Sequence, residues 1–269
     1  MKKIFILLLL VTISACATSP TGRSQLMLVS PEQAISASRE AYIQTLAPLQ
    51  EKGQVDSDPA ISTRVRLITG RLIAQAIKIY PHTSNWEWSV KVIDDQKMVN
   101  AWCMAGGKMA IYTGLIDQIK ATDDEIAQVM GHEISHALAN HTAERMSVAM
   151  ASQLGLVGLA IATKDNDYGG AILTGSALAA ALAITLPNSR TSETEADIMG
   201  IEIAARAGYD PRAAATLWRK MGAVGGKTPP QFLSTHPSPA NRQENLSSMA
   251  EQLMVLYREQ KDRPVYPLQ

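Results

Sequence analysis

The chain has 269 residues, of which 46% are hydrophobic, 19% charged and 5% aromatic, and its 25 basic residues balance its 25 acidic residues. This hydrophobic fraction is too high for a disordered chain, and a net charge of zero lacks the basic excess that nucleic-acid binding requires. Two cysteines exclude a disulfide scaffold. We therefore expect one globular domain, with a short appendage at most and no nucleic-acid partner.

The N-terminus differs in composition from the rest of the chain. Two lysines precede an apolar run over residues 4–11, and small residues follow before Cys16. The run is shorter than the roughly 20 apolar residues of a membrane span, which predicts a secretory signal peptide over residues 1–15. Residues 13–16 (ISAC) resemble the lipobox of bacterial lipoproteins, in which the cysteine is lipidated. A cleaved secreted protein with an incidental cysteine is the alternative.

Residues 17–22 are polar and rich in turn formers, so we predict a lipidated N-terminus and a tether over residues 16–30. Ala17 after the cysteine is typical of lipoproteins sent to the outer membrane. We therefore predict a protein of the bacterial cell envelope, held by an acyl (palmitate) anchor at the outer membrane and facing the periplasm. Cys103 is then the remaining cysteine, and it is predicted to be a buried thiol, with an intermolecular disulfide as the alternative.

Residues 31–269 are predicted to form the folded domain. Ser30 and Pro31 begin a helix that ends near Leu49, and an apolar stripe predicts a second helix over 61–79. Alternating residues over 86–93 predict a strand, and two short strand-like runs flank Gly106 and Gly107. These segments predict a small antiparallel sheet.

The second half of the chain is predicted to be helical. A capping box at Thr122 and Glu125 begins a helix over about 123–140. Two apolar runs within about 148–187 predict a helical hairpin that packs in the core, because each run is shorter than a membrane span. Membrane insertion, or a face that dips toward lipid or gates the site, is the alternative. Further helices are predicted over about 191–206, from residue 210 and over about 239–261, with a loop over 225–239. The fold class is therefore α+β and mainly α-helical.

Two histidines lie one turn apart in the middle of the helix predicted over 123–140. His132 and His136 project from one face and can reach one metal ion, while Glu133 lies beside that face and can take a proton from metal-bound water. A pair of surface histidines is the alternative. It is disfavoured because Glu133 lies among apolar residues, where burial of an unpaired charge is costly.

A catalytic zinc ion takes three protein ligands and one water molecule. His141 does not have the spacing of the metzincin third ligand and is predicted to lie at the C-terminal end of the helix. Glu193 and Asp197 share one face of the helix over 191–206, whereas Glu195 points away. We predict Glu193 as the third ligand and Asp197 as an acid that bonds a ligand histidine or stabilises the reacting centre. An exposed acidic first turn is the alternative.

The motif His132-Glu133-x-x-His136, followed about 57 residues later by Glu193-x-x-x-Asp197, resembles the HtpX- and Oma-like zinc metallopeptidases. Asn100-Ala101 and Gly106-Gly107 ahead of the helix add to the resemblance, which covers about residues 86–245, and the lipobox points to the periplasmic lipoprotein branch. The resemblance implies a zincin-type metallopeptidase domain with one Zn²⁺ per chain. It also implies His132, His136 and Glu193 as zinc ligands, Glu133 as general base and Asp197 as an acid near the site. Trp102-Cys103 departs from the family pattern, which bears on substrate preference.

Two further groups are candidates for the site. Residues 236–242 resemble the family's His-Pro segment, so His236 is predicted to cap the zinc in a resting state or to help hold the oxyanion, and Arg242 to bind the substrate carbonyl. A plain loop histidine with a capping arginine is the alternative. Asn100, Gly106 and Gly107 are predicted to bind substrate, because an extended polypeptide can add to an exposed sheet edge at 109–113. A plain hairpin turn explains the glycines equally well.

These features predict a zinc endopeptidase that hydrolyses unfolded or misfolded polypeptides of the cell envelope. Its partners would be those polypeptides and, through the anchor on Cys16, the membrane. The alternative is a non-catalytic lipoprotein that escorts outer-membrane proteins. In that protein the zinc would be structural and closed by a fourth ligand, for which His236 is the candidate.

Overall fold

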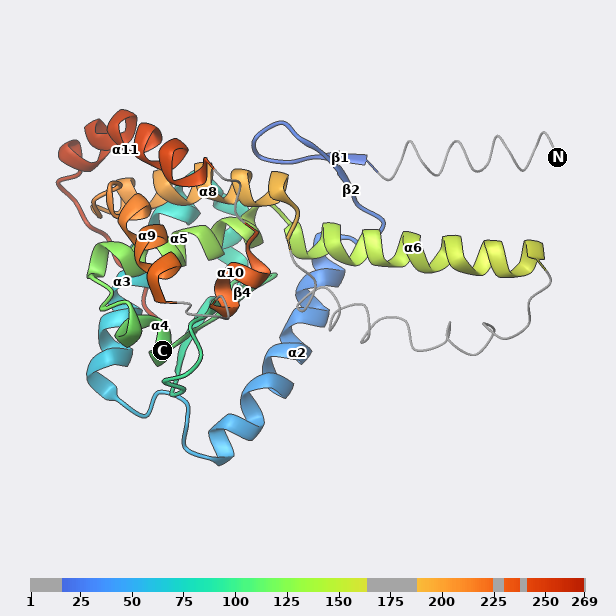
Figure 1. Ribbon diagram of the computed structural model, residues 1–269, viewed down its shortest axis with the longest axis horizontal. Helices are drawn as coiled ribbons and strands as arrows, with labels where there is room; N and C mark the ends of the chain where they lie inside the picture. Colours follow the sequence, from blue (N-terminus) through green and yellow to red (C-terminus); the bar gives the residue numbers. More distant parts are fainter. Residues whose placement is uncertain (1–15, 164–187, 225–229, 238–240, 269) are drawn as a thin grey trace.

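The computed structural model describes residues 16–163, 188–224, 230–237 and 241–268 (Figure 1). The predicted signal peptide and the whole second half of the predicted hairpin lie outside these residues. The described part is α+β and mainly helical, as the sequence predicts. Its elements in chain order are β1 (Cys16–Thr18), β2 (Ser24–Leu26), α2 (Pro31–Glu51), α3 (Pro59–Ile79), η1 (Pro81–Asn85), β3 (Ser89–Ile93), β4 (Ala101–Met104), β5 (Lys108–Tyr112), α4 (Thr113–Gln118), α5 (Asp123–Leu138), α6 (His141–Thr163), α8 (Arg190–Arg206), α9 (Ala213–Val224), α10 (Gln231–Thr235) and α11 (Arg242–Glu259).

The three-stranded sheet is mixed, so the prediction of an antiparallel sheet is wrong for one of its strands. Its order is β3-β5-β4, with β3 parallel to β5 and β4 antiparallel to it. After β3 the chain crosses to the far side of the sheet, forms β4, and turns back so that β5 inserts between the two. Alternation of apolar residues identifies strands but does not specify their neighbours, which is why the sequence did not reveal the crossover.

Helix α5 lies in the centre of the molecule and is buried from Glu125 to Leu138. It packs most extensively against α8, and the two helices meet at Gly131 and Gly200. A methyl group on Gly200 would lie 2.7 Å from the backbone nitrogen of His132. The two backbones therefore touch, and this brings the start of α8 close to the histidines of α5.

The segment predicted to be a tether forms a hairpin of β1 and β2, in which Cys16 pairs with Leu26. Arg23 between the strands forms ion pairs with Glu144 of α6 at 2.6 Å and with Glu195 of α8 at 3.1 Å. Residues 16–26 are therefore bound to the body of the protein.

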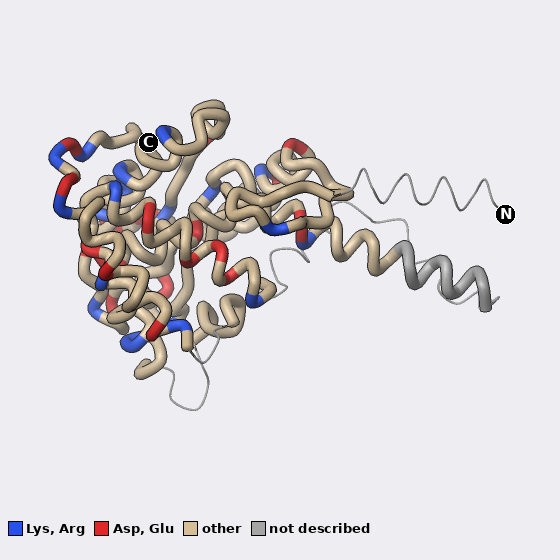
Figure 2. The backbone as a smooth tube through the Cα atoms, turned by 90° about the horizontal axis from the view of Figure 1, so that it is seen from above, with Lys and Arg blue, Asp and Glu red and all other residues tan. Residues whose placement is uncertain are grey.

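Helix α6 extends from the body on the same side as this hairpin in both views (Figures 1 and 2). It begins at His141, earlier than the predicted hairpin at 148, and the residues after Thr163 that would complete the hairpin lie outside the described ranges. No helix in the described ranges combines the length and the apolar composition needed to cross a bilayer. Acidic and basic residues are interspersed over the body of the protein (Figure 2).

Candidate metal centre

Helix α5 places its two histidines and Glu133 in the protein interior. The helix begins at the predicted capping box, in which the side chain of Thr122 accepts the Glu125 N–H and the carboxylate of Glu125 accepts the Thr122 N–H. Only 5% of His132 and 3% of His136 is exposed. Because both rings leave the same face of the helix, their Nε2 atoms lie 3.1 Å apart.

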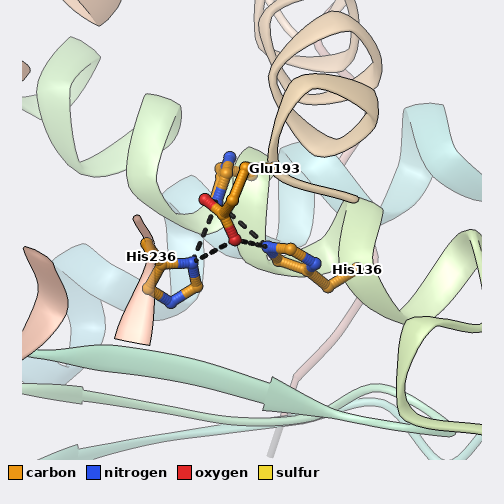
Figure 3. Close-up of side chains that lie close together, drawn as sticks. His136, Glu193 and His236 are labelled. Carbon is orange, nitrogen blue, oxygen red and sulfur yellow. Dashed lines mark hydrogen bonds and ion pairs between the residues drawn. The ribbon is translucent and has the colours of Figure 1, made fainter. Parts of the chain in front are cut away.

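Four donor atoms from three segments converge at this point. They belong to His132, His136, Glu193 of α8 and His236 after α10, and all lie within 4.8 Å of one another. Figure 3 shows the rings of His136 and His236 and the carboxylate of Glu193 directed toward one another. Glu193 lies 3.3 Å from Nε2 of His132, 3.3 Å from Nε2 of His136 and 3.0 Å from Nδ1 of His236.

This donor set fits a zinc ion. Ligands of a tetrahedral zinc lie about 2.0–2.2 Å from the ion, so two of them are roughly 3.3–3.5 Å apart, close to the separations found here. The carboxylate of Glu193 is fully buried, and its Oε2 makes no hydrogen bond among the described residues, its neighbours being the ion-pair partners His132 at 3.3 Å and Arg242 at 3.2 Å. A buried carboxylate facing three imidazole nitrogens calls for a cation, and two histidines with one glutamate are a frequent ligand set of catalytic zinc.

Burial and charge determine how these groups titrate. Burial favours a raised pKa for Glu193, but the surrounding imidazoles, His132 foremost, hold the pKa of this carboxylate far below its usual range. Burial opposes the charged form of His132, but Glu193 and Asp197 outweigh it and raise the pKa of His132 to about 9. Burial raises the pKa of Glu133, which makes this carboxylate a better proton acceptor.

Glu133 lines a cleft beside the donor cluster. Its Oε2 accepts the backbone N–H of Cys103 in β4 at 3.1 Å, and its Oε1 lies 3.3 Å from Nε2 of His236. The residues that line the cleft include Glu133, Cys103 and His236, together with Asn100, Trp102, Arg145 and Asn188. Glu133 is therefore held by the edge strand β4 with one oxygen facing the cleft.

Asp197 and Arg242 lie behind the histidines of α5. Oδ1 of Asp197 is 3.0 Å from Nδ1 of His132, and Arg242 donates hydrogen bonds of 2.6 and 2.7 Å to the same carboxylate. The guanidinium also stacks on Trp218 at 3.6 Å and lies 3.2 Å from Glu193. Arg242 is 2% exposed, so its position differs from the predicted contact with a substrate carbonyl.

His236 is positioned by α10, a short helix within the segment predicted to be a loop. Its ring stacks on Phe232 with 4.2 Å between centroids, and the Phe232 N–H donates to the carbonyl of Val99 ahead of β4. His236 thus faces the metal ligands and Glu133 at the same time.

Gly106 and Gly107 lie in the turn between β4 and β5, away from the residues that line the cleft. Both have positive φ, and an added methyl group would collide with Ile35 at Gly106 or with Trp88 at Gly107. The expectation of an exposed sheet edge at 109–113 is wrong, because β5 is the central strand and β4 is the edge beside the site. Asn100, just ahead of β4, does line the cleft.

The sequence did not predict the roles of three residues. His141 was expected at the end of α5 but begins α6, where it is buried and lies 2.7 Å from Nδ1 of His136. Glu195 points away from Glu193, as its spacing implies, and lies 3.0 Å from Nε2 of His141. The amide nitrogen of Asn188 lies 3.5 Å from His136 and 3.4 Å from His236. The turn between α5 and α6, with φ of 56° at Asn140, brings His141 into contact with His136. No pattern in the sequence marks this turn.

Comparison with known proteins agrees with this geometry. The model of peptidase family M48 matches residues 59–250. The mitochondrial metalloendopeptidase OMA1 of Arabidopsis thaliana is 37% identical over 66% of the chain and 35% of its own length, and that of Homo sapiens is 31% identical over 88% and 46%. The beta-barrel assembly-enhancing protease of Escherichia coli is 28% identical over 73% of the chain and 40% of its own length. The chain thus spans less than half the length of these three relatives.

Proposed function

The chain belongs to peptidase family M48, whose members are zinc-dependent metallopeptidases, and on that premise we propose that it is a zinc endopeptidase acting on unfolded polypeptides. The observation that carries the proposal is the convergence of His132, His136 and Glu193 beside a buried carboxylate, Glu133, that lines a cleft. The names of these relatives, two metalloendopeptidases and a protease, support it.

The residues of the site divide the chemistry among them. Zinc held by His132, His136 and Glu193 would acidify a water molecule and polarise the scissile carbonyl. Glu133 takes the proton from the attacking water and returns it to the leaving amine. The Cys103 N–H holds Oε2 of Glu133, so that Oε1 faces the cleft. Asp197 and Arg242 orient the ring of His132.

The test is Glu133→Gln in the purified, zinc-loaded protein, with a reduced and alkylated polypeptide as substrate. The variant should bind zinc like the wild type and lose about 10²–10⁴-fold in kcat, because the amide cannot accept the proton. Glu202→Gln, a change in a half-exposed ion pair on α8, is the control and should cleave normally. Turnover by Glu133→Gln close to that of the control would contradict the assignment.

A structural zinc in a non-catalytic binding protein is the second candidate, and the position of His236 favours it. A fourth protein donor closes a zinc site, whereas a catalytic site leaves that position to water. His236→Ala separates the two. Retained zinc with faster cleavage supports a histidine that blocks a resting enzyme, whereas loss of zinc without any cleavage supports a structural site.

We further propose that the protein works in the bacterial cell envelope, with Cys16 carrying a lipid anchor and envelope polypeptides as substrates. The lipobox-like residues 13–16 and the exposure of Cys16 support this location. The name of the E. coli relative, a beta-barrel assembly-enhancing protease, is consistent with substrates among outer-membrane proteins.

A further inference from the structure

A chain of hydrogen bonds leads from His136 to the far side of the site. Nδ1 of His136 lies 2.7 Å from Nδ1 of His141, and Nε2 of His141 lies 3.0 Å from Oε2 of Glu195. All three side chains are buried, with exposed fractions of 3% or less. The Nε2 of His136 at the other end of this chain is one of the four converging donor atoms.

The carboxylate fixes the direction of every bond in this chain. A carboxylate only accepts, so His141 donates its Nε2–H to Glu195. A buried neutral imidazole carries one proton, so Nδ1 of His141 is an acceptor and Nδ1 of His136 donates to it. Nε2 of His136 then carries no proton, and its lone pair is directed to the point where the donor atoms converge, as a metal ligand requires.

The N-terminal hairpin holds the carboxylate at the end of the chain. The Thr21 hydroxyl donates to Oε1 of Glu195 at 2.7 Å, and Nε of Arg23 donates to Oε2 at 3.1 Å. The other two nitrogens of Arg23 donate to Glu144 at 2.6 Å each. A planar guanidinium bound to two carboxylates has little freedom to move, so the position of Glu195 depends on the hairpin.

We propose that His141, Glu195 and the β1–β2 hairpin are positioning elements of the metal centre, which fix the tautomer and the ring orientation of His136. This inference rests on the proposed zinc site. His132 meets its carboxylate, Asp197, directly, whereas His136 reaches Glu195 through a second imidazole. The β1–β2 hairpin, which begins at Cys16, therefore supports the zinc site in addition to linking the N-terminus to the body of the protein.

The proton positions can be observed directly by ¹⁵N NMR of the five histidines, which distinguishes the two neutral tautomers of each ring. We expect a proton on Nε2 of His141 and on Nδ1 of His136, with assignments from His141→Gln and from His82→Gln as a control remote from the site. A proton on Nδ1 of His141 would reverse the chain and overturn the proposal.

Zinc affinity, measured by competition with a chelator, tests the energetic consequence without any substrate. Glu195→Gln should weaken zinc binding about 10- to 100-fold, as losses of such outer hydrogen bonds do. Arg23→Gln should act in the same direction with a smaller effect, and Glu202→Gln on the same helix should have none.

Circular dichroism of the metal-free variants shows whether each one folds. If Glu195→Gln does not fold, Thr21→Val takes its place. It removes the hydrogen bond to Glu195 and the longer one of 3.3 Å to the Ser19 hydroxyl, and the expected loss is several-fold. The proposal is overturned if a folded Glu195→Gln binds zinc within twofold of the wild-type affinity. The same criterion applies to Thr21→Val where that variant replaces it, whether or not the protein cleaves polypeptides. Weaker zinc binding supports it even if no cleavage is found, so its failure is distinct from that of the proposed activity.

Discussion

Cys103 contributes its backbone N–H to the site, while its thiol is buried and unreactive. The N–H holds Glu133, and the Sγ atom is buried beside the carbonyl of Met104. Burial, with the nearby charge of Glu133, raises the pKa of the Cys103 thiol well above its ordinary value. Because the thiolate is the reactive form, little of it exists at neutral pH.

We therefore predict that, in folded protein prepared without the lipid on Cys16, a thiol reagent at pH 7.5 modifies Cys16 and leaves Cys103 intact. Mass spectrometry of the wild type and of Cys16→Ala measures this, with the denatured protein as the reference for full reactivity. The folded Cys16→Ala variant should react at least about 100-fold more slowly than the denatured one, because reaction requires both opening of the site and ionisation. Equal rates would show that the thiol is accessible.

Helical spacing predicts which residues of the site share one face of a helix, but it does not predict the contact between His141 and Glu195. His132 and His136, or Glu193 and Asp197, lie one turn apart, so helical geometry alone puts each pair on one face. His141 and Glu195 are separated by 54 positions and meet only after the turn at Asn140 redirects the chain. Periodicity gives the direction of a side chain on its own helix and leaves its partner unspecified.

At the scale of elements, the contact between α5 and α8 sets the distance from Glu193 to the histidines. Gly200→Ala would place a methyl group 2.7 Å from the backbone of His132, and the clash can be relieved only if the helices separate. We predict a loss of about 1–3 kcal/mol in the free energy of unfolding, typical of overpacking, and weaker zinc binding. Urea unfolding and chelator competition measure the two effects.

Gly222→Ala in α9 is the matched control, because no atom of the described residues, apart from the helix's own backbone, lies within 4 Å of the added methyl group. It should be neutral or stabilising by up to about 1 kcal/mol, since alanine favours a helix more than glycine does. If Gly200→Ala behaved like Gly222→Ala, close approach of the helices would not determine the geometry of the site.

Asp56 connects the loop before α3 to the sheet and gives the stability a dependence on pH. It accepts the Val92 N–H and pairs with Lys91 and Arg66. Burial alone would raise the pKa of Asp56, but these partners together lower it. A lowered pKa in the folded state means that the stabilisation is present above the unfolded pKa of 3.8 and is lost as the pH falls through the folded value.

Asp56→Asn should therefore destabilise the metal-free protein by about 1.5–3 kcal/mol at pH 7, because hydrogen bonds to a charged group are lost. The difference from wild type should shrink as the pH falls below about 4, where the wild-type aspartate takes up its proton. Urea unfolding of both proteins from pH 7 to pH 3 tests this, with Glu202→Gln as an exposed control. A difference independent of pH would exclude a contribution from the charge.

Two capping residues in the sequence predicted where helices begin, whereas no pattern in the sequence predicted the strand order. Ser30 and Thr122 begin α2 and α5 as predicted, because each side chain satisfies a free N–H of the first turn. The parallel pairing of β3 with β5 depends on a crossover over residues 94–100 that no local preference encodes. The helix α10 escaped prediction because five residues in a proline-rich segment carry too short a pattern.

At the scale of the whole molecule, the N-terminal hairpin and α6 lie on one side of the body (Figures 1 and 2). The sequence suggested a tether after Cys16, yet Ser19 and Gln25 are buried and Arg23 is bound to two helices. A lipid on Cys16 would therefore hold this side of the protein close to the membrane, because the hairpin that begins at Cys16 is packed on the body and leaves little flexible linker between them. The polar composition of residues 17–25 did not reveal this, because their partners lie on distant helices.

The anchor itself gives the last prediction. Cells that express the protein with a labelled fatty acid should transfer label to the wild type and to Cys103→Ala, but not to Cys16→Ala, because only Cys16 is exposed and follows the lipobox-like residues. One acyl chain binds a membrane weakly and reversibly, whereas the several chains of a lipoprotein hold it firmly. On fractionation, the ratio of soluble to membrane-bound protein should therefore be at least about tenfold higher for Cys16→Ala than for the wild type. Equal label on wild type and Cys16→Ala would mean that this cysteine carries no lipid, and the contacts of the hairpin with Glu195 would then serve the metal centre alone.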